Sequence, residues 1–184
     1  MLLVLDSLFI ILVSIFLTFL FSDRIVNKKG LFLILFSSIF LHELAHKVIA
    51  YRYGYVSYIA SELSLPFLIL SIILYYFLGV LIPPPIYTRI FAVDTGTGLA
   101  YTIFTINRQN AINTAIIAFA GPLTNLILGL SAFIVIKLRF YHNEEEKKFL
   151  ESLFMLNLML FIINMIPFKG TDGYWILESI KKII

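Results

Sequence analysis

The chain has 184 residues, of which 60% are hydrophobic and 14% charged, and its formal net charge at pH 7 is +3. A mean hydropathy of +0.97 lies outside the range of ordinary soluble domains, so we expect most of the chain to lie in lipid. The small net charge gives no case for nucleic-acid binding, and the lack of cysteine excludes disulfides and thiolate metal ligands.

Five apolar runs are long enough to cross a bilayer as helices. They cover residues 2–21, 31–52, 63–82, 111–136 and 149–184, the last interrupted near 164–171. The first run carries Asp6 and lacks both a preceding basic stretch and a cleavage pattern, which indicates a retained span. We therefore expect a single membrane-embedded domain over residues 1–184, an all-α polytopic fold of five to six transmembrane helices. The lysines and arginines are too evenly divided to fix its orientation.

The longest connection, between the third and fourth runs, has a pattern of its own. Ile86–Val93 and Leu99–Ile106 are rich in β-branched and aromatic residues and flank the turn-forming stretch Asp94-Thr95-Gly96-Thr97-Gly98. This pattern predicts a small β-hairpin insertion over residues 86–106, entered through Pro83-Pro84-Pro85. The triplet Asp94-Thr95-Gly96 also occurs in aspartic proteases, but these need two copies and the chain has one, so a turn explains it.

The second apolar run contains the segment His42-Glu43-Leu44-Ala45-His46. On a helix, histidines four residues apart project from one face and can share a zinc ion. Glu43 follows His42 directly, where it can reach a metal-bound water as a general base without being a ligand. The alternative is a set of membrane polar groups satisfied by neighbouring helices. Burying such a cluster unpaired in lipid costs roughly several kcal/mol of stability, so a functional site is the favoured interpretation.

A catalytic zinc site usually has a third protein ligand and an open position for water. His142 is one candidate, but it precedes the charge run Asn143–Lys148, which is typical of a solvated loop. Asp172 is the better candidate, because it follows an apolar helix and precedes a second helical stretch. Its structural alternative is a helix N-cap.

The chain resembles the site-2 protease family of intramembrane zinc metalloproteases, in a short archaeal or bacterial form. The match comprises three segments in order: His42–His46 with Ala50 and Gly54, then Ala120-Gly121-Pro122-Leu123-Thr124-Asn125, then Asn164, Pro167, Asp172 and Gly173. Their joint occurrence from residue 42 to 173 covers most of the chain and is more specific than the first segment alone.

The resemblance implies one Zn²⁺ per chain, held by His42, His46 and Asp172, with Glu43 activating a water that attacks the scissile peptide bond. It implies a transmembrane protein or peptide as substrate, a place in the cell membrane of a prokaryote and no cofactor besides the metal. Asn164 and Asn125 become candidates for binding the substrate backbone or the oxyanion. The alternative is a polar group at a helix kink for Asn164, and close helix packing for Asn125 and Gly121.

The depth of the three ligands constrains the last run. His42 lies near the middle of its run, whereas Asp172 lies six residues beyond Ile166 and would be outside the bilayer if the last run were one complete span. We therefore predict a broken element over Phe149–Ile184, interrupted at 164–171, that returns Asp172 to the level of the histidines across a water-filled cavity.

Two other functions fit parts of the pattern. Intramembrane histidine and aspartate also mark the pathways of metal-ion transporters, but the apolar runs offer few further donors beyond Asp6, Glu62 and Glu178. A catalytically silent zinc-binding scaffold is the third option, against which Glu43 argues. The oligomeric state, the substrate and its cleavage site are not determined by the sequence.

Overall fold

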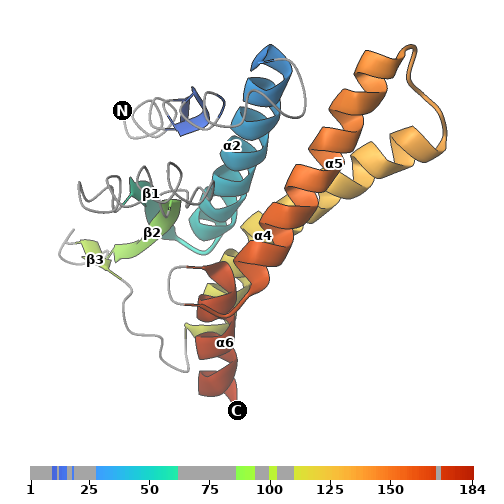
Figure 1. Ribbon diagram of the computed structural model, residues 1–184. Coiled ribbons are helices and arrows are strands. Elements are labelled where there is room, and N and C mark those ends of the chain that lie inside the picture. The colour runs from blue at the N-terminus through green and yellow to red at the C-terminus, as the bar shows by residue number, and fades with distance from the viewer. Residues whose placement is uncertain are drawn as a thin grey trace, which may run out of the picture.

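The computed structural model describes residues 10–11, 13–15, 18, 28–61, 86–93, 100–102, 110–168 and 171–184. Its elements are α2 (Lys28–Arg52), β1 (Tyr55–Ser61), β2 (Ile86–Val93), β3 (Ala100–Thr102), α4 (Ala111–Lys137), α5 (Glu144–Met165) and α6 (Asp172–Ile183). The described residues between 10 and 18 are also helical. The described chain is therefore mostly helical, with one small sheet beside the helices (Figure 1).

Helix α4 is the central element of the helical part. It packs against α2, α5 and α6, and Figure 1 shows α5 running back along the C-terminal half of α4 while α6 lies beside its N-terminal half. Gly129 allows the close contact with α5, because a Cβ there would already be 3.4 Å from the Phe154 carbonyl oxygen. The arrangement brings α2 and α6 to the same part of α4.

Among the described residues, three helices are long and apolar enough to cross a membrane, namely α2, α4 and α5. In the most apolar 18-residue window of α5 the mean hydropathy is 1.5, yet only 6% of that window is buried inside the protein. The buried residues, by contrast, are nearly as often polar as apolar within the described part of the chain. An apolar exterior around a partly polar interior is the distribution expected of helices surrounded by lipid.

The remaining predicted spans, residues 2–21 and 63–82, lie outside the described residues apart from the helical positions between 10 and 18. The number of five to six spans therefore stays a prediction. The predicted spans 31–52 and 111–136 correspond to α2 and α4, with boundaries that differ by a few residues.

The sheet has the order β1-β2-β3, and both pairs are antiparallel. Strand β1, which the sequence analysis did not predict, follows α2 after a turn in which Gly54 has a φ of 78°, a left-handed conformation that glycine adopts without steric cost. Strands β2 and β3 fall within the predicted hairpin, with Val93 opposite Ala100. Residues 94–99 and 103–106 lie outside the described part, so the complete hairpin stays a prediction.

Helix α5 begins earlier than predicted. The charge run Asn143–Lys148 was expected to be a solvated loop, and this prediction is wrong for residues 144–148, which form the first turns of the helix. The Asn143 side chain accepts a hydrogen bond from the Glu146 backbone N–H at 2.8 Å. With three glutamates in the first turn, this N-cap complements the positive end of the helix dipole and starts the helix within the charge run.

The last apolar run is divided between two helices. Helix α5 ends at Met165 and α6 starts at Asp172, so the interruption lies at 166–171. Thr171 ties this segment together, because its hydroxyl is 2.5 Å from the Ile166 carbonyl oxygen and 2.7 Å from that of Phe168. Thr171, not Asp172, occupies the N-cap position of α6, which leaves the Asp172 carboxylate available for other contacts.

Gly173 fixes the angle at which α6 leaves this break. A Cβ at this position would lie 2.6 Å from the carbonyl carbon of Met165 and 2.9 Å from the Ile166 carbonyl oxygen. Both neighbours are backbone atoms, which cannot rotate away. Only glycine allows the first turn of α6 to pack on the end of α5 in this way.

We expect Gly173→Ala to destabilise the protein by about 1–3 kcal/mol, the usual cost of forcing an extra methyl group into a packed site. Thermal unfolding of the full chain in detergent measures this effect. Gly129→Ala is the matched control, because its added Cβ would make only ordinary van der Waals contacts at 3.4 Å and beyond. Equal unfolding temperatures for the two variants would contradict this account of Gly173.

Candidate metal centre

His42 and His46 lie on one face of α2, one turn apart. Both are buried, with 7% and 4% of their surface exposed, and Glu43 between them is also buried at 4%. The four-residue spacing predicted this common face. Such polar residues are costly in an apolar helix unless each finds a partner.

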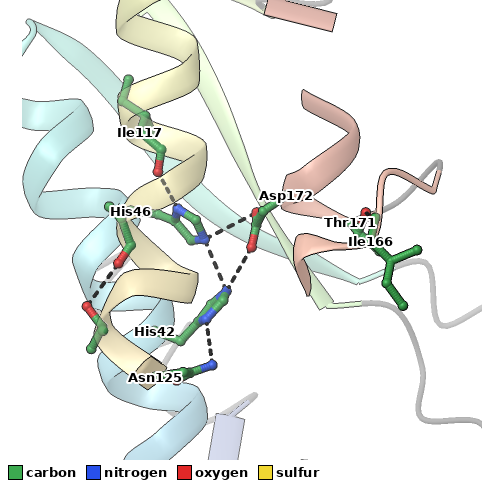
Figure 2. A network of polar contacts seen from close by, with 9 residues as sticks. His42, His46, Ile117, Asn125, Ile166, Thr171 and Asp172 are labelled. Carbon is green, nitrogen blue, oxygen red and sulfur yellow. Dashed lines mark hydrogen bonds and ion pairs between the residues drawn. The ribbon is translucent and has the colours of Figure 1, made fainter. Parts of the chain in front are cut away.

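Asp172 supplies the third donor, from the first turn of α6. One of its carboxylate oxygens lies 3.2 Å from His42 Nε2, and the other lies 3.4 Å from His46 Nε2. The two Nε2 atoms are 3.1 Å apart. Figure 2 shows the three side chains converging from two helices that are remote in sequence.

The spacing of these donors fits a small divalent cation. Zinc bonds to imidazole and carboxylate are about 2.0–2.2 Å long, so donors in a tetrahedral site are separated by roughly 3.4 Å. The observed separations of 3.1, 3.2 and 3.4 Å are close to this value. The group His42, His46 and Asp172 could therefore hold a metal ion, and its nitrogen and oxygen donors suit zinc.

Helix α4 orients both rings from the other side. The Nδ1 atom of His46 is 2.7 Å from the Ile117 carbonyl oxygen, and that of His42 is 3.0 Å from the Asn125 side-chain nitrogen. Because Nδ1 of each ring is occupied, both Nε2 atoms face Asp172. Metal-binding histidines usually donate their second ring N–H to an acceptor, as the Ile117 carbonyl oxygen allows for His46.

Gly121 lets α4 come close to the two rings. An ideal Cβ at this position would lie 2.6 Å from His42 Nε2 and still closer to His46 Nε2. A side chain here would therefore occupy the place beside both nitrogens that a shared metal ion requires. Pro122, the next residue, lacks an N–H, so it cannot donate the usual helical hydrogen bond to the Ala118 carbonyl oxygen one turn earlier.

Glu43 is close to the same centre without belonging to the donor group. It interacts electrostatically with His46, and the group of donors that could hold a metal does not include it. Its placement beside the ligands is compatible with the predicted part in proton transfer. That part itself stays a prediction.

The other predicted residues differ in their relation to this centre. Asn164 lies partly buried in the last turns of α5, and none of the contacts given above involves it. Its predicted role at the substrate is not tested. His142 lies in the connection between α4 and α5, where its backbone N–H donates to Glu146, and it is not part of the donor group.

Sequence reasoning missed the direct contact of Gly121 and Ile117 with the histidines. Gly121 was expected to serve close helix packing. It lies where α4 contacts the imidazoles of His42 and His46 on α2. The signal was present in the spacing, since Gly121 and Asn125 repeat the four-residue interval of His42 and His46. When two helices carry residues at the same four-residue spacing, these residues can face each other across the contact. The sequence did not show that these two helices pack together.

We expect Gly121→Ala to remove metal binding, because its Cβ would lie 2.6 Å from His42 Nε2 and closer still to His46 Nε2, so both rings would have to leave their positions. Alanine raises helix propensity by about 1 kcal/mol over glycine, so the helix itself should not suffer. Metal content of the purified variant, measured by mass spectrometry, gives the result. Gly129→Ala, two turns further along α4, should bind metal as the unmodified chain does. A metal-replete Gly121→Ala protein would show that the ion lies elsewhere.

Comparison with known proteins gives one relevant relative. A protein of Bacillus subtilis (strain 168) with the name "Putative zinc metalloprotease YwhC" is 28% identical over 156 residues, covering 76% of this chain. The chain spans 64% of the length of that relative. No family model and no solved structure matches the chain. The chain is thus distantly similar to a protein named as a zinc metalloprotease and has a donor group that could hold the metal.

Proposed function

We propose that this protein is a zinc metalloprotease of the site-2 protease type, which hydrolyses peptide bonds of membrane-spanning substrates within or beside the bilayer. The observation that carries the proposal is the meeting of His42, His46 and Asp172, whose donor atoms all lie within 4.8 Å of one another, next to a buried glutamate. The distant similarity to a protein named as a zinc metalloprotease supports the same chemistry.

The membrane location follows from the helices that carry the site. The histidines belong to α2, one of the three helices long and apolar enough to cross a membrane, and α4, which orients them, is another. A site built between such helices lies at membrane depth. We propose a multi-pass protein whose catalytic centre opens to water inside the bundle, in the cell membrane of a prokaryote.

His42, His46 and Asp172 would hold one zinc ion per chain, leaving a fourth position for water and substrate. When bound, zinc supplies Lewis-acid polarisation of the scissile carbonyl and makes the water more acidic. Glu43 takes the proton from the attacking water and passes it to the departing amine. The pairs that hold the rings, Ile117 with His46 and Asn125 with His42, keep both histidines oriented toward Asp172.

Substrate presentation is the least constrained step of the proposal. A helical substrate has to be unwound before its backbone reaches the site, and an extended segment can be held by adding a strand to a sheet edge. The order β1-β2-β3 leaves β1 and β3 at the edges, and β1 follows α2 after a short turn. We propose this sheet as the docking surface, with Asn164 as a candidate for contact with the substrate backbone.

A metal transporter would be expected to carry several donor groups along a path. Within the described ranges, His42, His46 and Asp172 form the one group of at least three such donors. Glu178, one of the other intramembrane candidates, is paired with Lys181 at 2.7 Å. A single closed group beside a glutamate fits hydrolysis better than conduction, and a catalytically silent scaffold would have no use for that glutamate.

We expect Glu43→Gln to keep zinc and to lose cleavage of a single-span substrate by a factor of about 10²–10⁴, the usual contribution of a general base. The assay uses the full chain reconstituted in vesicles, with zinc content measured on the same preparation. Glu178→Gln makes the same chemical change on α6, away from the donors, and should leave both quantities unchanged.

Each outcome distinguishes between the candidate functions. Full cleavage by Glu43→Gln would contradict the mechanism. Zinc uptake into vesicles by both the unmodified chain and Glu43→Gln, without cleavage by either, would favour the transporter. Zinc binding with neither cleavage nor uptake would favour the scaffold.

A further inference from the structure

The Nδ1 contacts of the two histidines look alike but differ in chemistry. Both partners lie on α4, at Ile117 and Asn125, two turns apart with Gly121 midway between them. The Ile117 carbonyl oxygen can only accept a hydrogen bond, so Nδ1 of His46 carries the hydrogen and its Nε2 presents a lone pair. This is the tautomer that binds a metal through Nε2.

His42 has the opposite arrangement. Its Nδ1 lies 3.0 Å from Nδ2 of Asn125, and an amide nitrogen can only donate. The His42 Nδ1 therefore accepts, and its Nε2 carries the hydrogen that can be donated to the Asp172 oxygen 3.2 Å away. In this tautomer His42 cannot bind a metal through Nε2.

The second polar atom of Asn125 is left without a partner. Asn125 is 1% exposed, and its Oδ1 is a buried oxygen with no hydrogen-bond partner among the described residues. A half turn about the last side-chain bond exchanges the oxygen and the nitrogen of an amide with little change of shape. The oxygen would then face His42 Nδ1 and accept a hydrogen from it.

After this half turn, the amide nitrogen of Asn125 can donate a hydrogen bond to a backbone carbonyl oxygen of its own helix. Asn157 demonstrates this elsewhere in the protein, because its Nδ2 lies 2.9 Å from the Leu153 carbonyl oxygen one turn back on α5. The corresponding carbonyl for Asn125 is that of Gly121. Exchange therefore trades an unpartnered oxygen for a nitrogen that has an acceptor within its own helix.

We propose that Asn125 is a positioning residue whose side-chain oxygen accepts a hydrogen bond from His42 Nδ1 when the metal is held. The inference rests on the proposed metal site and extends it. Asn125 selects the tautomer of His42: the oxygen facing the ring frees Nε2 for the metal, and the nitrogen facing the ring directs Nε2 to Asp172. His46 needs no such partner, because a backbone carbonyl fixes its tautomer permanently.

The decisive variant is Asn125→Asp, which keeps the shape but offers only acceptors at neutral pH. Zinc affinity of the full chain in detergent is measured by competition with a chromogenic chelator. We expect Asn125→Asp to bind zinc at least as tightly as the unmodified chain. Asn125→Leu, which offers no polar atom, should bind about 10- to 100-fold more weakly, the usual effect of losing a group that orients a metal ligand.

Asn157→Leu is the control for the loss of a buried amide. Asn157 is also fully buried, but it hydrogen-bonds Ser38 and a carbonyl of its own helix, so its replacement should leave zinc affinity unchanged. Nitrogen-15 spectra of histidine-labelled protein give a second measure, in which the hydrogen of His42 should be on Nδ1 in the zinc-loaded protein.

Three results would overturn the inference. If Asn125→Asp binds zinc as weakly as Asn125→Leu, the amide acts as a donor. If Asn125→Leu binds zinc normally, the residue does not position His42. If the unmodified chain binds no zinc at all, the metal site fails and this inference with it. The first two leave the metal site standing, so the two failures are distinguishable.

Discussion

The close approach of α4 to α2 at Gly121 is the contact on which the site depends. Two imidazoles fill the space that the missing side chain leaves, and α4 binds one ring on either side of the glycine, through Ile117 and Asn125. With Nδ1 engaged, each ring loses its freedom to rotate and turns Nε2 toward Asp172. The donors are thus oriented before any ligand arrives, which reduces the reorganisation that metal binding requires.

The same helices keep their polar side chains away from lipid. Their outward faces are apolar, while buried positions include Ser38, Glu43, Asn125 and Asn157 beside the histidines. In lipid such polar groups are stable only inside the bundle and only with partners. The break between α5 and α6 adds a carboxylate to this interior, because a helix that ends and restarts can direct its first turn inward where a continuous helix would pass by.

The sequence predicted the parts that depend on local spacing. The interval between His42 and His46 placed both rings on one face, and the depth of Asp172 relative to the last apolar run predicted the break at 164–171. Its position between two helical stretches favoured Asp172 over His142 as the third ligand, and the family resemblance then implied the full set of three. The start of α5 was missed because capping by Asn143 outweighed the charge of the run that follows. The role of Gly121 could not be read, because it depends on which helix faces the histidines, and spacing along one helix does not carry that information.

The three donors belong to segments far apart in the chain. His42 lies in α2 and Asp172 at the start of α6, a separate short helix. Residues 166–168 and 171, which precede α6, are not helical. An ion held by both helices would be a tertiary cross-link, because a site made of donors from α2 and α6 forms only when α6 is docked, and the binding energy would add to the docking. Occupancy of the site and attachment of the C-terminal helix are then two views of one equilibrium. Loss of the ion would weaken the packing of α6 on the other helices, and a change that undocks α6 would lower the affinity for the ion.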